Sequence, residues 1–374
     1  MTPTIPLRIK KIGFIGLGRM GKEMVIHLLE SGIDVAVFNR SREKTKELEK
    51  EAIEIPSQTR GKNPVMHTVG GGDPSTRPMN IGLARDDTNN HGKLIATYKL
   101  KELVNNLAFP RVIWLMVEHG KPVDEVIENL LKAGIGKGDI IIDGGNSFYK
   151  DSVRRYKKLK DIGIHYIDAG TSGGIEGARK GACLMIGGDK AIVRQLSWLW
   201  DILSGSPLQE VLLQRPSGQG GWGYFGPSGA GHFVKMVHNG VEYGMLQAIG
   251  EGFELLSKGP YKLDLHKIAV NWNHGSVVRG WLMELLEKAF KDDPKLERIS
   301  GIVGGGSTGE WTVQTAKELG VESPVIRESL LARKNSRSKP TFAGKVVAAL
   351  RYQFGGHPME KFEDNKIKDA KLQR

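Results

Sequence analysis

A glycine-rich turn between an apolar run and an amphipathic stretch is the feature that most constrains the fold of this chain. Residues 11–40 read KIGFIGLGRMGKEMVIHLLESGIDVAVFNR, in which a short apolar run leads into the spacing G-x-G-x-x-G. Gly32 then ends the amphipathic stretch in the way usual for a helix C-terminus, and a second apolar run follows. Strand, glycine turn, helix and strand within about 30 residues are typical of a dinucleotide-binding unit.

Each of the three glycines has a specific task in such a unit. Gly16 permits a tight turn, Gly18 lets the backbone approach a pyrophosphate, and Gly21 lets the helix pack close to the strand. The amides at the start of the helix then face the phosphates. A glycine turn without a ligand is the alternative, but the flanking strands favour dinucleotide binding. The predicted cofactor loop comprises Gly16, Leu17, Gly18, Arg19, Met20 and Gly21.

The end of the second apolar run indicates which dinucleotide is bound. An NAD site usually has Asp or Glu there, on the ribose 2′-hydroxyl. This chain has Asn39, Arg40, Ser41 and Arg42 instead. No carboxylate at that position repels a 2′-phosphate, and guanidinium groups bind phosphate in a bidentate manner. The pattern favours NADP over NAD, with the alternative that these arginines simply open a solvated helix.

Strand-like and helix-like segments alternate from residue 99 to residue 170. RVIWLMV, GDIIIDGGNS and IHYIDAG are typical of strands, and the stretches between them have helical periodicity. This alternation predicts a doubly wound α/β domain of the Rossmann type over 1–226, with functional groups at the carboxyl ends of the strands. The residues at or just past these ends are Met116, Val117 and Asn146, which we assign to the cofactor, and Ser172.

Residues 52–93 interrupt this pattern. They are rich in Gly, Pro, Asn, Asp and Thr and have few periodic apolar positions, so we expect a flexible surface insertion. The glycines of this segment do not stand between a strand and a helix, and they are therefore not a second phosphate loop.

Composition narrows the classes of function. The chain has 374 residues, which suggests two domains, and no apolar run approaches the ~20 residues needed to span a bilayer. The single cysteine, Cys183, excludes an intrachain disulfide and fits a reducing cytoplasm; we expect it to be a small buried residue. The formal charge of +12 is spread along the chain without a basic–aromatic strip, which argues against nucleic acid and for an anionic small molecule.

The second half of the chain has almost no strand signal. After residue 226 the segments LQAIGEGFELLSK, LHKIAVNWNHG, VVRGWLMELLEKAF and FAGKVVAALRYQF all have helical periodicity. We predict an all-helical domain over 227–374 that binds substrate and forms a dimer.

One helix of this domain, GHFVKMVHNGVEYG at 231–244, carries an unusual set of polar residues. Lys235 and Glu242 are separated by ~10 Å along the helix axis, which is too far for an ion pair. A lysine at a buried position can act as a base, whereas a solvated helix face is an equally open alternative. The polar face comprises Lys235, His238, Asn239 and Glu242, and the expected apolar side comprises Phe233, Met236, Val237, Val241 and Met245.

The whole chain, apart from 52–93 and the last dozen or so residues, resembles decarboxylating 6-phosphogluconate dehydrogenase, most closely its shorter-chain branch. The matching stretches are GFIGLGRMG, IIDGGNSFYKDSVRR, GTSGGIEGARKG, GHFVKMVHNGVEYG and the terminal FGGH. GFIGLGRMG alone indicates only the broader β-hydroxyacid dehydrogenase superfamily. Ile175 and the stretch GGGSTGEWT depart from the family, and the Asn39–Arg40 pair is similar to that of the longer NADP enzymes.

The resemblance implies roles for individual residues. Lys235 is the implied general base and Glu242 the implied general acid. The phosphate pocket in the family is completed by the partner's tail, which here implies Arg351 and His357 of the second subunit of a homodimer or homotetramer. The other implied substrate-binding residues are Asn146, Ser172, Gly173, Gly174, His238 and Asn239, with Tyr243 and Arg279 at the phosphate.

The implied reaction is oxidative decarboxylation of 6-phospho-D-gluconate to D-ribulose 5-phosphate and CO₂ with reduction of NADP⁺ or NAD⁺, a step of the pentose phosphate pathway. Neutral Lys235 accepts the C3 hydroxyl proton as hydride leaves C3, the β-keto acid loses CO₂, and Glu242 protonates C1. No metal is required, and no metal-ligand cluster appears in the sequence. Two alternatives stay open: another β-hydroxyacid dehydrogenase, of the 3-hydroxyisobutyrate type, and a non-catalytic dinucleotide sensor.

Overall fold

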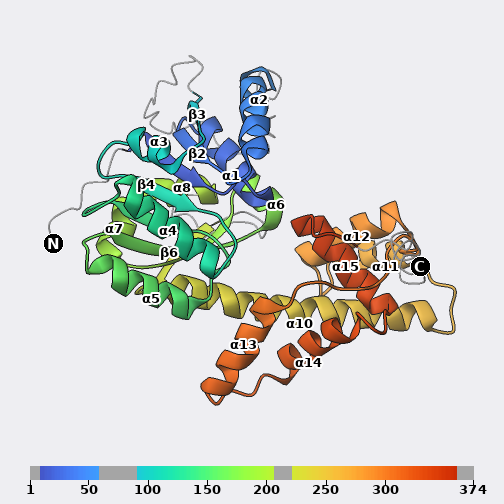
Figure 1. Cartoon of the computed structure of the whole chain (residues 1–374). Coiled ribbons are helices and arrows are strands. Elements are labelled where there is room, and N and C mark those ends of the chain that lie inside the picture. Colours follow the sequence, from blue (N-terminus) through green and yellow to red (C-terminus); the bar gives the residue numbers. More distant parts are fainter. Residues whose placement is uncertain (1–8, 59–90, 206–220, 360–374) are drawn as a thin grey trace, which may run out of the picture.

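The computed structural model describes residues 9–58, 91–205 and 221–359. A sheet domain and a group of helices are joined by one long helix, α10, which runs along both (Figure 1). The sheet domain contains β1 (Lys11–Ile15), α1 (Arg19–Glu30), β2 (Asp34–Phe38), α2 (Arg42–Gln58), β3 (Leu94–Thr97), α3 (Leu100–Asn105), β4 (Val112–Leu115), α4 (Lys121–Ala133), β5 (Ile140–Asp143), α5 (Tyr149–Lys160), β6 (His165–Ser172), α6 (Gly174–Lys180), β7 (Cys183–Gly187), α7 (Lys190–Gln195), α8 (Ser197–Ser204) and β8 (Gly221–Gly226). The helical part contains α10 (Ala230–Lys258), α11 (Leu265–Asn273), α12 (Trp281–Asp292), α13 (Ser307–Glu318), α14 (Pro324–Asn335) and α15 (Phe342–Gly355).

The sheet has eight strands in the order β3-β2-β1-β4-β5-β6-β7-β8, and every neighbouring pair is parallel except β6–β7. All residues of β4 and β5 are buried, as expected of central strands covered on both faces. The core under α1 and α8 includes Leu28 and Trp200, whereas the core under α3, α4 and α5 includes Ile127 and Leu159. The predicted Rossmann-type α/β domain followed by an all-helical region is therefore confirmed.

The sequence patterns left several elements of the sheet domain unpredicted. β3, β7 and β8 are short strands at the outer positions of the sheet, and β8 has only one residue buried in six. The insertion expected over 52–93 begins later than predicted, since α2 continues to Gln58 and β3 begins at Leu94. Its central part, 59–90, lies outside the described residues.

Glycines allow α10 to lie at the centre of the molecule. A Cβ built on Gly231 would lie 2.3 Å from the carbonyl oxygen of Met185 in β7, and one on Gly240 would lie 2.6 Å from Thr312 of α13. A Cβ on Gly250 would lie 2.8 Å from a carbonyl oxygen of α15. The helix is thus packed through its smallest residues. The predicted apolar side was in part wrong, because Val237, Val241 and Met245 are exposed.

The buried apolar residues of the described ranges form separate clusters in the sheet domain and in the helical part. Two clusters belong to the sheet domain and end at Trp222, and the third begins at Leu246 and includes α12 and α15. This separation supports our proposed division into domains 1–226 and 227–374. No helix within the described ranges is long and apolar enough to cross a membrane.

Candidate active site

The glycine turn between β1 and α1 has the geometry of a phosphate-binding loop. Gly16 has φ +104°, and a Cβ on it would lie 2.3 Å from the carbonyl oxygen of Met116. A Cβ on Gly21 would lie 2.1 Å from the Gly16 carbonyl oxygen, so α1 packs tightly on the turn. A Cβ on Gly18 would meet no atom of the described residues within 4 Å. Gly18 therefore leaves a backbone surface open to a ligand at the start of α1, which fits a dinucleotide pyrophosphate.

The end of β2 is tied to the same turn. Asn39 accepts a hydrogen bond from the Leu17 amide at 2.9 Å and donates one to the Ser41 carbonyl oxygen at 3.0 Å. The Ser41 hydroxyl donates to the Glu43 carboxylate at 2.8 Å, and the side chain of Arg40 is exposed. Asn39 therefore shapes the turn, while Arg40 is available to a ligand beyond the strand end.

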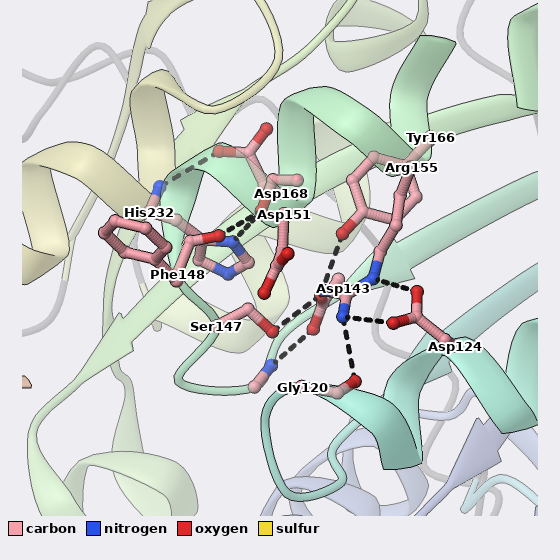
Figure 2. A network of polar contacts seen from close by, with 12 residues as sticks. Gly120, Asp124, Asp143, Ser147, Phe148, Asp151, Arg155, Tyr166, Asp168 and His232 are labelled. Atoms are coloured by element: carbon pink, nitrogen blue, oxygen red, sulfur yellow. Dashed lines mark hydrogen bonds and ion pairs between the residues drawn. The ribbon is translucent and has the colours of Figure 1, made fainter. Parts of the chain in front are cut away.

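Two buried aspartates hold α10 and the turn after β5 against the sheet (Figure 2). Asp168 of β6 accepts hydrogen bonds from the backbone amides of Gly229 at 2.7 Å and His232 at 2.9 Å. Asp143 of β5 accepts from the Ser147 hydroxyl at 2.8 Å and from the Gly145 amide at 3.2 Å. The first set fixes the N-terminal turn of α10, and the second fixes the turn that carries Asn146.

Arg155 balances the charge of Asp143 beneath this turn. Its guanidinium lies 3.4 Å from Asp143 and also donates to Asp124 at 2.8 Å and to the Gly120 carbonyl oxygen at 2.9 Å (Figure 2). Asp143 is fully buried and Arg155 is 2% exposed. Removing one partner of such a pair leaves an uncompensated charge in the interior.

We expect Arg155→Met to lower the free energy of unfolding by about 3–5 kcal/mol, because it leaves the buried Asp143 carboxylate without a positive partner. Urea unfolding followed by circular dichroism measures the change. Arg154→Met is the matched control, since Arg154 contacts the same Asp124 from an exposed position and should cost about 1 kcal/mol or less. Equal losses of stability in the two variants would show that the buried ion pair stabilises the fold no more than the exposed one.

A chain of hydrogen bonds runs from α10 to the end of β6. The Lys235 ammonium nitrogen donates to Asn239 Oδ1 at 2.7 Å, and His238 Nδ1 lies 3.0 Å from the same oxygen. His238 Nε2 lies 3.3 Å from the Ser172 hydroxyl. A neutral imidazole with its proton on Nδ1 satisfies both contacts. Burial, followed by the charge of Lys235, lowers the pKa of His238 and favours that neutral form.

Lys235 is buried against the sheet. Its side chain is 8% exposed, and a Cβ built on Gly170 of β6 would lie 2.5 Å from the Lys235 Cβ. Burial lowers the pKa of the Lys235 amine, an effect that the charges of Glu242 and Cys183 partly offset. A larger fraction of this amine is consequently neutral near pH 7 than is usual for lysine, and a neutral amine can take up a proton. Cys183 is exposed toward the same space, so its predicted burial was wrong.

Basic groups gather near Tyr243, about two turns beyond Lys235 on α10. The Arg333 guanidinium carbon of α14 lies 3.6 Å from the ring centroid of Tyr243, and the Arg333 side chain is 5% exposed. Burial lowers the pKa of Arg333 to about 10. Arg351 and His357 line the same space from α15 and the turn after it. Burial, and then Arg351, Arg19 and Arg333, lower the pKa of His357 to about 4.

The structure places three predicted phosphate-binding residues differently with respect to this basic end. Arg351 and His357 of this chain line the cavity that also contains Lys235, with α15 packed along α10; their origin in an assembled oligomer stays a prediction. Arg279 lies in an exposed turn between α11 and α12, outside the residues that line the space. Arg333 occupies the basic end instead. Its sequence context, LLARKNS, has no feature that separates it from a surface arginine.

Most of the predicted site residues border one cavity of about 1880 Å³ between the sheet domain and the helices. Asn146 links its two walls by donating to the Thr308 hydroxyl of α13 at 2.8 Å. Among the predicted site residues, Gly16, Leu17, Asn39, Arg40, Ser41 and Arg279 are not in the lining. The lining includes Gly18, Arg19, Met20, Gly21, Met116, Val117, Asn146, Ser172, Gly173, Gly174, Lys235, His238, Asn239, Glu242, Tyr243, Arg351 and His357.

Two known sequence families match the two parts of the chain. Residues 11–205 match the NAD binding domain of 6-phosphogluconate dehydrogenase, and residues 231–368 match the 6-phosphogluconate dehydrogenase C-terminal domain. The chain belongs to the 6-phosphogluconate dehydrogenase family. Family membership confirms the resemblance drawn from the sequence motifs, and it agrees with a cavity that joins a dinucleotide loop to a cationic end.

Individual members of the 6-phosphogluconate dehydrogenase family are similar over most of the chain. A Bacillus subtilis (strain 168) protein, YqeC, provisionally named a 6-phosphogluconate dehydrogenase, is 50% identical over 71% of this chain and 84% of its own. The NAD⁺-dependent, decarboxylating enzyme of Haloferax volcanii is 37% identical over 95% of this chain and all of its own. The Plasmodium falciparum enzyme, solved with NADP⁺ and with 6-phosphogluconate, has a TM-score of 0.68 at 30% identity and covers 91% of this chain and 70% of its own.

Proposed function

We propose that this protein catalyses the oxidative decarboxylation of 6-phospho-D-gluconate to D-ribulose 5-phosphate and CO₂ with NADP⁺ or NAD⁺. The observation that carries the proposal is the shared lining of one cavity by Gly18, Lys235, Glu242 and Arg351. A dinucleotide loop, a buried amine, a carboxyl group and a cationic end are the groups that a phosphorylated hydroxyacid needs in one place.

The dinucleotide is held by the turn between β1 and α1. The backbone at Gly18 and the first amides of α1 hold the pyrophosphate, and Arg40 reaches the adenosine ribose from the end of β2. The nicotinamide would supply the acceptor for the hydride from C3 of the substrate. Asn146, Ser172 and the glycines that follow it support the substrate at this end of the cavity, since they line it beside Met116 and Val117.

Lys235 and Glu242 of α10 divide the proton transfers between them. Neutral Lys235 removes the proton from the C3 hydroxyl and then hydrogen-bonds the oxygen as CO₂ leaves. Glu242, two turns further along α10, donates a proton to C1 of the enediol. His238 and Asn239 hold the sugar hydroxyls, because the hydrogen bonds between them orient both side chains toward Lys235 and Ser172.

The basic end of the cavity favours a phosphorylated substrate over a simple hydroxyacid. Arg333, Arg351 and His357 converge there with Tyr243. Mutual repulsion among cations with few acids nearby is relieved by a dianion, and a 6-phosphate has that charge. A 3-hydroxyisobutyrate-type substrate carries no phosphate and would leave these buried charges uncompensated.

The test is an assay with 6-phosphogluconate and either NADP⁺ or NAD⁺, recording both reduced nicotinamide and released CO₂. We expect the two products in equal amounts. Reduced nicotinamide without CO₂ would favour a simple hydroxyacid dehydrogenase, and cofactor binding without turnover would favour a sensor. We further propose that the protein is a homodimer or homotetramer with a cytoplasmic role in the pentose phosphate pathway.

Cofactor choice has its own test at the end of β2. We expect Arg40→Ala to raise KM for NADP⁺ by about 10-fold or more, because a charge-assisted contact to the 2′-phosphate is lost, with little change for NAD⁺. Lys44→Ala, which removes an exposed charge from the first turn of α2, is the control. Equal losses with both dinucleotides would indicate that Arg40 does not recognise the 2′-phosphate.

A further inference from the structure

Arg19 connects two parts of the site that are far apart in the sequence, the cofactor turn and the turn after α15. It is the first residue of α1, so its backbone belongs to the cofactor turn. Its side chain leaves that turn, because Nη1 donates a hydrogen bond to the carbonyl oxygen of Gly356, in the turn after α15. One residue therefore joins the dinucleotide loop to the segment that carries His357.

The end of α15 and the turn after it pack closely against the sheet domain at several points. A Cβ built on Gly174 would lie 2.0 Å from the carbonyl oxygen of Phe354, so the backbones of α6 and α15 touch there. A Cβ on Gly356 would lie 3.0 Å from Ile175 Cδ1 and 3.3 Å from Arg19 Cδ. The Arg19 side chain thus crosses directly over Gly356. Arg19 is itself exposed, and this contact ties its side chain to the turn.

The charge of Arg19 also acts at the basic end of the cavity. Burial, and then the charges of Arg351 and Arg19, lower the pKa of His357, and Arg19 contributes to the lowered pKa of Arg351 after burial. Arg19, Arg333, Arg351 and His357 all line the cavity. Positive groups that disfavour one another's charge gain most from an anion placed among them.

We propose that Arg19 determines specificity for the phosphate of the substrate, by adding its charge to the basic end and by fixing the turn that carries His357. The inference rests on the proposed function and adds to it a phosphate-recognising residue from the cofactor loop. A different assignment is contact of the Arg19 guanidinium with the cofactor pyrophosphate through the donors that Gly356 does not use, and it predicts a raised KM for the dinucleotide instead. The backbone amides of α1 serve the pyrophosphate without it.

The first experiment compares Arg19→Gln with Lys22→Gln. Lys22 lies on the same helix, pairs with Glu51 and does not line the cavity, so it removes one positive charge from α1 as a matched control. We expect Arg19→Gln to raise KM for 6-phosphogluconate about tenfold or more, with KM for the dinucleotide changed less than about threefold, and Arg19→Lys to restore part of the loss. A higher KM for the dinucleotide with an unchanged KM for 6-phosphogluconate would overturn the proposal.

A second experiment does not depend on turnover. Calorimetric titration of the dinucleotide-saturated protein with inorganic phosphate measures the basic end directly. We expect weaker binding by about tenfold in Arg19→Gln and unchanged binding in Lys22→Gln. Equal binding by wild type and Arg19→Gln, or none by wild type, would overturn the inference. A wild type that binds phosphate through Arg19 but does not oxidise 6-phosphogluconate would refute the proposed function and leave the phosphate site in place.

Discussion

Replacing Lys235 with methionine is expected to lower kcat by about 10²–10⁴-fold while the dinucleotide still binds. The factor is that of a lost general base. Methionine keeps the length and the apolar stem of the side chain, so the packing of Lys235 against Gly170 of β6 survives. The measurement is steady-state kinetics with 6-phosphogluconate, combined with fluorescence titration of reduced dinucleotide.

Lys180→Met is the matched control for this substitution. Lys180 lines the same cavity from α6, but it is exposed and paired with Glu176, so its loss should change kcat less than about twofold. Loss of both turnover and dinucleotide binding in Lys235→Met would show that Lys235 is structural. Full retention of turnover would remove it from the proposed mechanism.

The pH dependence of the wild type follows from the direction of the shift at Lys235. Because burial lowers the pKa of this amine, the neutral base is present at lower pH than for an exposed lysine. The rate should therefore increase with pH through the lowered pKa and level off above it. In Lys235→Met this acid limb should be absent from the residual rate.

The sequence predicted best where local backbone geometry alone decides the outcome. The spacing of Gly16, Gly18 and Gly21 requires a tight turn, an open backbone and a closely packed helix. The structure has all three features, and each depends only on the residues of the turn itself. The face shared by Lys235 and Glu242 likewise follows from helix periodicity. In both cases the neighbours along the chain were enough.

The sequence predicted least where the outcome depends on which distant elements meet. Arg333 lines the cavity only because α14 packs beside α10 and places Arg333 over Tyr243. The sequence of α14 alone does not predict that contact. The exposed side of α10 was misjudged because the helix packs against β7, α13 and α15 at Gly231, Gly240 and Gly250, on different sides, which a periodicity of large apolar residues does not reveal.

The origin of the tail can be decided by mixing two variants that are impaired in different ways. Arg351→Met should raise KM for 6-phosphogluconate by about 10–100-fold, because the phosphate loses a charge-assisted contact at the buried end of the cavity. Lys235→Met is inactive for a different reason, since its basic end is intact. If each site took Arg351 from a partner, a hybrid of the two variants would contain one complete site.

The structure predicts that no complete site forms in such a hybrid. Lys235 and Arg351 of one chain line one cavity, and the turn after α15 is held by Arg19 and Gly174 of that chain. Mixed and refolded variants should therefore show only the activity of Arg351→Met at saturating substrate and none of the wild-type affinity. Recovery of the wild-type KM would prove that tails are exchanged between subunits. A wild-type chain refolded with Lys235→Met controls for the refolding itself, because its sites should keep the wild-type KM under either arrangement.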